Sequence, residues 1–261
     1  MSEVPAFKVV MLCRDDDTTR IMYHRLSIDW QIIGVIVEDK PSTRLMLQRR
    51  MRKLGGWTVL GQVLCMLYTR LVAARMARRA LDALLRAEHL NTAPLPVERV
   101  TRVASANDPE VIRLLREWQP DAVVVNGTRI LSSAVLASIP APFINTHAGI
   151  TPRYRGVHGG YWALVQNDAE HCGVTVHLVD EGIDTGGVLY QGMIEVGPQD
   201  SFLTYPVRQV ARALPLMHQA LSDVQQHGAA LRTVAGVGPS ALWSHPTVWA
   251  YVRNWWKYSV K

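Results

Sequence analysis

Short apolar runs alternate with mixed polar segments along the chain, and this pattern predicts strands and helices in turn. Residues 7–13 and 31–37 are largely apolar, which is typical of buried strands. Between them, residues 15–19 can cap a helix whose apolar positions include Ile21 and Leu26. A strand, a helix and a strand at this spacing predict a parallel crossover unit.

The same alternation returns after residue 96. The expected strands are residues 97–103, 121–125, 142–146, 173–179, 187–196 and 231–237. The expected helices are residues 107–118, 131–137, 161–166 and 202–227. This order predicts an α/β fold, in which a Rossmann-like, mostly parallel sheet is flanked by helices.

Residues 44–90 interrupt this alternation with a basic segment of helical character. It contains ten Lys or Arg residues and only two acids, Asp82 and Glu88. Its uncharged stretch, residues 57–69, is shorter than the about 20 residues that a membrane span needs. We therefore expect a basic helical insertion at about residues 41–92. We favour a hairpin that packs on the domain or at a dimer interface, and a surface helix on an anionic membrane is the alternative.

The chain divides into a larger domain, residues 1–200, and a small helical and strand region, residues 201–261. The second region is rich in aromatic residues: Trp243, Trp249, Tyr251, Trp255, Trp256 and Tyr258. Basic residues lie among and after them. Such a mixture can stack bases and hold phosphates. It is more often a core or interface element, so we favour the interface and expect a homodimer.

Composition and charge exclude several classes of protein. With 261 residues, 48% of them hydrophobic, the chain can bury a core and is not disordered. The net charge of +6 suits an anionic partner, and equally a soluble enzyme with a basic face. Cys13, Cys65 and Cys172 have neither zinc-site nor disulfide spacing, so we expect buried thiols in a reducing compartment. With no visible secretory signal, we expect a cytoplasmic protein, with peripheral membrane contact as an alternative.

Candidate catalytic chemistry concentrates between residues 143 and 191. Asn145 and His147 are two positions apart at the end of an expected strand, so their side chains lie on the same side of it. Asp184 lies in the glycine-rich turn GIDTGG, where backbone can approach a ligand closely. Each residue alone is most simply structural: a loop amide, a half-buried histidine and a turn aspartate. Only their combination points to a catalytic site.

These motifs resemble those of the folate-dependent formyltransferases, which act on glycinamide ribonucleotide, methionyl-tRNA or nucleotide sugars. The resemblance rests on Asn145-x-His147, then PRYRG at residues 152–156, then Asp184-Thr185-Gly186. It includes the run RILS at residues 129–132 and extends from about residue 108 to 191. The first hundred residues resemble this family only in their alternation of strands and helices.

The resemblance implies an N-formyltransferase that moves a formyl group from 10-formyltetrahydrofolate to a primary amine, without a metal. Asn145 would stabilise the oxyanion, His147 would stabilise it or move a proton, and Asp184 would orient the imidazole. The implied folate-binding residues are Arg129, Ile130, Leu131, Gly182 and Ile183. The residues expected on the acceptor side are His158, Tyr154 and His177. For His177, a structural place in its strand is an equal alternative.

Departures from the family pattern narrow the choice of acceptor. The turn after the first strand, CRDDDTT at residues 13–19, has three aspartates and no glycine, which disfavours a phosphate and therefore glycinamide ribonucleotide. About 35 residues follow the last long helix, too few for the C-terminal barrel of the tRNA enzymes, so a nucleic-acid partner is not expected. We expect a nucleotide-linked amino sugar, as in polysaccharide biosynthesis. The alternatives are another amine, such as aminoacyl-tRNA, glycinamide ribonucleotide or an amino-acid derivative, or a non-catalytic folate- or nucleotide-binding protein of this fold.

Overall fold

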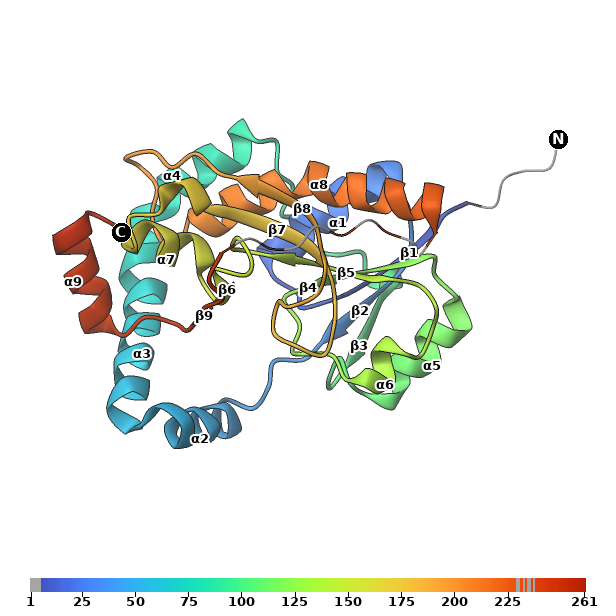
Figure 1. Cartoon of the computed structure of the whole chain (residues 1–261), viewed down its shortest axis with the longest axis horizontal. Helices are drawn as coiled ribbons and strands as arrows, with labels where there is room; N and C mark the ends of the chain where they lie inside the picture. Colours follow the sequence, from blue (N-terminus) through green and yellow to red (C-terminus); the bar gives the residue numbers. More distant parts are fainter. Residues whose placement is uncertain (1–5, 229–230, 232, 234–235, 237) are drawn as a thin grey trace.

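A seven-stranded sheet forms the centre of the molecule (Figure 1). The computed structural model describes residues 6–228, 231, 233, 236 and 238–261. The strands, in sheet order, are β3 (Val100–Val103), β2 (Gln31–Glu38), β1 (Lys8–Cys13), β4 (Ala122–Asn126), β5 (Phe143–His147), β7 (Gly173–Leu178) and β8 (Val188–Met193). Neighbours from β3 to β5 are parallel, whereas β7 is antiparallel to both β5 and β8. The predicted Rossmann-like α/β fold is confirmed.

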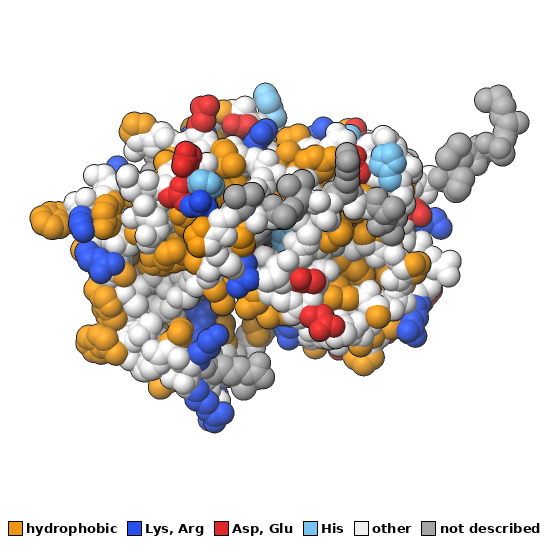
Figure 2. Space-filling view, viewed as in Figure 1, with side chains coloured by type: hydrophobic (Ala, Val, Ile, Leu, Met, Phe, Trp, Pro, Cys, Tyr) orange, Lys and Arg blue, Asp and Glu red, His pale blue; other side chains and the backbone are white. Residues whose placement is uncertain are grey.

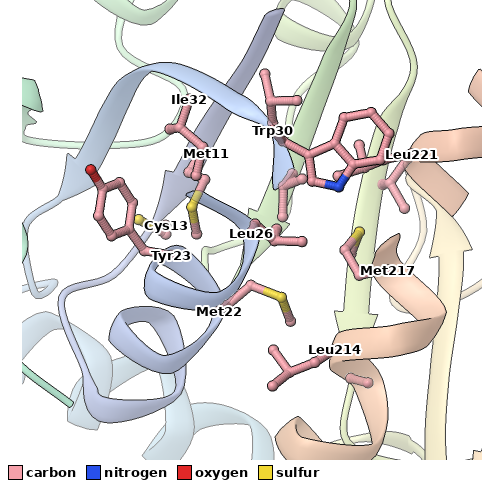
Figure 3. Close-up of a cluster of buried hydrophobic side chains, with 14 of the residues drawn as sticks. Met11, Cys13, Met22, Tyr23, Leu26, Trp30, Ile32, Leu214, Met217 and Leu221 are labelled. Atoms are coloured by element: carbon pink, nitrogen blue, oxygen red, sulfur yellow. The ribbon is translucent and has the colours of Figure 1, made fainter. Parts of the chain in front are cut away.

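Helices cover both faces of this sheet because its strands are apolar on both sides. One face is covered by α1 (Asp17–Asp29) and α8 (Tyr205–His227), and the other by α5 (Pro109–Trp118) and α6 (Ser133–Leu136). Alternate residues of β1 serve the two cores, with Met11 in the first and Leu12 in the second. In the first core Met11 packs with Met22, Leu26 and Met217 (Figure 3).

A helical segment separates β2 from β3. It consists of α2 (Thr43–Leu54), α3 (Gly56–Tyr68), the π-helical turn η1 (Thr69–Ala73) and α4 (Ala74–Ala87). From α3 to α4 the chain forms one 32-residue helix that is long and apolar enough to cross a membrane by length and composition alone. One side of it is nevertheless buried against the protein, through Val59, Gln62 and Cys65. This helix therefore lies along the domain.

The C-terminal region packs on the inserted helices. The two-residue strand β9 (Leu242–Trp243) pairs with β6 (Arg155–Gly156), and α9 (Val248–Tyr258) packs against α3. A buried cluster joins α3, α7 (Gly159–Val165) and α9, and includes Cys65, Tyr161, Phe202 and Tyr251. Part of the C-terminal aromatic cluster is thus a core element of this same chain.

One expected element, the strand at residues 97–103, differs in the structure. Residues 97–99 form a 3-10 turn, η2 (Val97–Arg99), because the Arg99 N–H donates back to the Pro96 carbonyl. The expected strand therefore begins only at Val100, where pairing with β2 starts. The strand expected at residues 231–237 falls largely outside the described residues. The three cysteines are buried and free, as predicted.

Candidate active site

Asn145 and His147 lie on the last strand of the parallel part of the sheet. Within β5, Asn145 is opposite Val125 of β4 on one side and His177 of β7 on the other. His147, two residues later, projects from the same face of the strand. The Asn145 side chain is half-buried and the His147 side chain is buried.

Four polar side chains from β5, β7 and the loop after β7 meet at this place. The Nδ2 atom of Asn145 lies 3.0 Å from Nε2 of His177. The two oxygens of Asp184 face the two histidines, with Oδ2 3.3 Å from Nδ1 of His147 and Oδ1 3.7 Å from Nε2 of His177. The structure thus brings together the three residues expected to be catalytic and adds His177 to them.

The β7–β8 loop is shaped so that Asp184 returns over β5. Asp184 has a φ of 51°, a left-handed conformation that aspartate tolerates better than most residues. The Asp180 carboxylate fastens the loop by accepting hydrogen bonds from the Gly182 N–H and the Thr185 hydroxyl. The Gly156 N–H, in the PRYRG run, donates to Oδ2 of Asp184 at 2.9 Å. Two loops that are distant in sequence therefore hold the carboxylate in place.

His147 is fixed from its other side by the Tyr154 backbone. Its Nε2 lies 2.7 Å from the Tyr154 carbonyl oxygen, so that nitrogen carries a proton. A side chain at Gly149 would collide with this carbonyl and place its Cβ 2.8 Å from Nε2, so only glycine fits there. The Tyr154 hydroxyl faces elsewhere and donates to Asp168 at 2.7 Å.

The pKa values of His147 and Asp184 are shifted in a way that favours a neutral imidazole beside a carboxylate. Burial lowers the pKa of His147, against the opposing effects of the Asp184 charge and the Tyr154 carbonyl. Burial alone would raise the pKa of Asp184. The nearby imidazoles of His177 and His147 and the hydrogen bond from the Gly156 N–H outweigh it and hold that pKa below its usual range. The pair can therefore accept a proton near neutral pH.

Thr175 of β7, which the sequence did not single out, ties the loop after β5 to the sheet. Its buried hydroxyl donates to the Gly149 carbonyl at 2.8 Å and accepts from the Thr151 N–H at 3.1 Å. The Gln191 amide of β8 approaches the same hydroxyl at 3.2 Å. No motif marks this residue, because a threonine in an alternating strand is ordinary.

The residues expected to bind folate lie on two loops, of which the first follows β4. The Arg129 guanidinium is held by Glu38, because its Nε donates to Glu38 Oε2 at 2.7 Å. The Arg129 backbone N–H also donates to Glu38, whose side chain is completely buried. The Asn107 side chain holds the next turn, through the Ile130 carbonyl and the Ser132 N–H.

In this loop Leu131 is buried and Ile130 is 51% exposed. On the second loop, Gly182 and Ile183 immediately precede Asp184, and Ile183 is also partly exposed. Glu38 and Asn107 position the first loop, and both were missed from the sequence. The only signal for Glu38 is a charged residue at the end of an apolar strand.

A cavity of about 440 Å³ opens beside Asp184. Its lining comes from the PRYRG loop, the loop before β8 and the chain after α8: Thr151, Pro152, Arg155, Asp184, Thr185, Gly186, Gly187, Val188, Thr233 and Gly236. Asp184 is the member of the polar cluster that lines it. The carboxylate therefore connects the cavity to His147.

The half-buried ring of His158 packs in an aromatic contact, with ring centroids 4.3 Å from Phe202 and 4.9 Å from His245. Burial, helped by His245, lowers the pKa of His158 to about 3. Within the described part of the chain, one group has metal-ligand geometry, formed by Asp168, Glu170 and His171. It is separate from the Asn145–Asp184 cluster.

Comparison with known proteins identifies relatives that match about half of this chain. Methionyl-tRNA formyltransferase from Trichlorobacter lovleyi is 33% identical over 132 residues, which are 50% of this chain and 40% of that protein. The enzyme of the same name from Anaeromyxobacter dehalogenans is 35% identical over 123 residues, 47% of this chain and 39% of that protein. The chain thus spans about two fifths of the length of these relatives.

Solved structures share the fold over a longer stretch. A 4-N formyltransferase from Francisella tularensis has a TM-score of 0.56 and 12% identity, over 91% of this chain and 76% of that chain. A phosphoribosylglycinamide formyltransferase from Anaplasma phagocytophilum has the same TM-score and 15% identity, over 91% and 96%. At such low identity these likenesses concern the fold alone.

The family model described as formyl transferase matches residues 69–221, more than half of the chain. The matched range contains β5, the PRYRG run and the loop that carries Asp184. The chain therefore belongs to the formyl transferase family.

Proposed function

We propose that this protein is an N-formyltransferase that moves the formyl group of 10-formyltetrahydrofolate to a primary amine. The observation that carries the proposal is the contact between Asp184 and His147, with Asn145 beside them and a cavity on the outer side of the carboxylate. Family membership supports the reaction class, and the proposal for the whole protein rests on these side chains.

In the proposed reaction the amine nitrogen attacks the formyl carbon and its C=O becomes an oxyanion. The bond from that carbon to N10 of the folate then breaks. The amine loses one proton, the leaving nitrogen gains one, and the products are a formamide and tetrahydrofolate.

Asn145 is suited to stabilise the oxyanion. One N–H of its amide points to His177, which leaves the second free to donate to the developing charge. A single donor of this kind contributes about 3–4 kcal/mol to transition-state stabilisation.

Asp184 and His147 are suited to take the proton from the attacking amine. Asp184 lines the cavity, and the neutral His147 behind it can share the proton through Nδ1. With Nε2 bound to the Tyr154 carbonyl, the imidazole cannot turn away while it becomes charged. The same pair can return the proton to the leaving folate nitrogen.

The loops at residues 129–131 and 182–183 would hold the folate. Ile130 and Ile183 are large apolar side chains with exposed surface, which suits the faces of a flat bicyclic ring. The backbone around Ile130, fixed by Glu38 and Asn107, would supply hydrogen bonds to the ring edge. When bound, the folate supplies the formyl group and a nitrogen leaving group.

The proposed acceptor is an amino sugar linked to a nucleotide. At the N-terminus of α1, where a phosphate could bind, Asp16 accepts a hydrogen bond from the Thr19 N–H at 3.0 Å. A carboxylate in this position disfavours phosphate and therefore glycinamide ribonucleotide. A structural neighbour covering 90% of this chain is described as a sugar N-formyltransferase from Shewanella, which agrees with the proposal at the level of fold.

Aminoacyl-tRNA is the second candidate acceptor. The curated relatives are methionyl-tRNA formyltransferases, and the net charge of +6 suits a polyanion. The test offers the purified protein 10-formyltetrahydrofolate with either a panel of nucleotide-linked amino sugars or methionyl-tRNA. Mass spectrometry then detects one added formyl group.

We expect formylation of an amino sugar and its loss in His147→Ala. Formylation of the tRNA would reject the sugar and keep the reaction. Folate turnover without an acceptor would indicate a hydrolase, and no turnover with any acceptor would reject the proposed function.

A further inference from the structure

The inserted helix exposes a continuous apolar stripe. Its members lie at alternating spacings of three and four residues, and each is between 42% and 72% exposed: Trp57, Leu60, Leu64, Leu67 and Leu71. This spacing places them on one side of the helix. The opposite side, with Val59 and Cys65, is buried in the protein. The stripe is therefore an outer surface of the folded chain.

Helix α9 extends this surface. The ring of Trp57 stacks on Trp249 with centroids 5.1 Å apart, which joins the two helices at their contact. Val252 and Trp255 of α9 are about half exposed, and Trp256 is 86% exposed. Together the stripe and these α9 residues form what we call the apolar face. Indole rings this exposed are uncommon on a surface that faces only water.

Basic residues accompany the apolar face throughout. The exposed cations nearest to it in sequence are Arg52, Lys53, Arg70, Arg75, Arg78, Arg79, Arg253 and Lys257. By contrast, α2, α3, η1 and α9 contain no acidic residue. In Figure 2 orange and blue side chains lie together over α9 and α3, at the left edge of the molecule. The part of this surface that α2, α3, η1 and α9 form therefore carries charge of one sign, and on α4 the acid Asp82 stands beside four arginines.

This charge pattern decides between the candidate occupants of the apolar face. A second copy of the chain would bring its own Arg and Lys residues against these, with no acid in α2, α3 or α9 to pair with them. A membrane-crossing helix would have to leave the domain and carry Arg70 and Arg75 into the hydrocarbon layer. An anionic lipid surface fits both the apolar and the basic side chains of this face, because it accepts apolar side chains between negatively charged headgroups.

We propose that the apolar face docks on an anionic phospholipid membrane, with the helix Gly56–Ala87 lying parallel to the surface. The leucines of the stripe enter the boundary between headgroups and acyl chains. The indoles of Trp57 and Trp256 sit at the headgroup level, and the flanking arginines bind lipid phosphates. The docking is independent of the proposed catalysis, so either can fail without the other.

The test is co-sedimentation of the full chain with vesicles of phosphatidylcholine alone or mixed with phosphatidylglycerol. We expect binding to the mixed vesicles, and weakening of it at high salt. The double variant Arg75→Gln with Arg79→Gln should bind about tenfold more weakly, since each basic residue near the surface contributes substantially. Replacing the same two residues by Lys should preserve binding, because the attraction depends on charge.

The contribution of apolar side chains to vesicle binding is tested with two matched double variants. Leu71→Gln with Trp256→Gln removes side chains that are 67% and 86% exposed on the apolar face, and should reduce binding at least tenfold. Ile28→Gln with Val97→Gln removes side chains that are 73% and 86% exposed elsewhere, and should leave binding unchanged. Lipids with brominated acyl chains should quench tryptophan fluorescence in the native protein and less in Trp256→Phe.

Three results would overturn the proposal. The first is equal binding to neutral and mixed vesicles. The second is no binding to the mixed vesicles by a protein that unfolds cooperatively. The third is a dimer in sedimentation equilibrium, without vesicles, that Leu71→Gln with Trp256→Gln converts to a monomer, because the apolar face would then belong to a second copy.

Discussion

The side-chain amide of Asn145 donates to His177, and this contact determines which hydrogen remains for a substrate. Nδ1 of His177 lies 2.7 Å from the Leu178 carbonyl oxygen, which can only accept, so Nδ1 carries the proton. Nε2 then has the lone pair that receives the Asn145 N–H at 3.0 Å. His177 is therefore a positioning residue, which holds the amide without touching the reacting atoms.

Two substitutions of His177 distinguish a role in orienting the Asn145 amide from a role in packing alone. We expect His177→Leu to lower kcat about tenfold to a hundredfold, because the Asn145 amide loses its orientation. The KM for the folate should change little. His177→Gln, whose side-chain oxygen can accept the same hydrogen bond, should recover part of the rate. Equal kcat values in the two variants would contradict this role.

Replacing Asp184 should change the pH dependence of the reaction. The Asp184 charge opposes the burial that lowers the pKa of His147, so Asp184→Asn should lower that pKa further. The acidic limb of the profile of kcat/KM against pH should move to lower pH. The plateau value of kcat/KM should fall about a hundredfold or more, since the proton acceptor is weakened. An acidic limb at unchanged pH would show that His147 does not set it.

His158 should make the protein less stable in acid. Its pKa is lowered from an ordinary value of about 6.5 to about 3, so the unfolded chain binds more protons between these values. The free energy of unfolding should therefore fall as the pH drops from about 6.5 towards 3. In His158→Asn, a residue that tolerates the φ of 59° at this position, the slope should be smaller. Urea unfolding at several pH values measures the slope, and an unchanged slope would contradict the prediction.

Glu38 should support both stability and folate binding. Glu38→Gln removes the buried charge that Arg14 and Arg129 contact, and should lower the free energy of unfolding by roughly 2 kcal/mol. The KM for 10-formyltetrahydrofolate should rise more than kcat falls, because the loop at residues 129–131 loosens. Glu117→Gln, in an exposed ion pair with Arg113, is the matched control and should change stability by less than about 0.5 kcal/mol. Equal effects of the two variants would argue against a special role for Glu38.

The sequence by itself determined the elements and part of the site. Apolar periodicity placed the central strands within a residue or two, because a buried strand must be apolar wherever it lies. The two-residue spacing of Asn145 and His147 required a shared side of the strand, since this follows from backbone geometry alone. The motif order indicated Asp184 as their partner.

Only the tertiary structure decided which distant residues support that site and which surfaces remain open. Pairing of β7 with β5 places His177 opposite Asn145, and the burial of Glu38 makes it the anchor of Arg129. The basic insertion and the aromatic C-terminus were each predicted, but their shared apolar face exists only because α3 and α9 pack together. Such contacts depend on how far-separated segments dock, and hydrophobic periodicity along a chain carries no information about which segments meet.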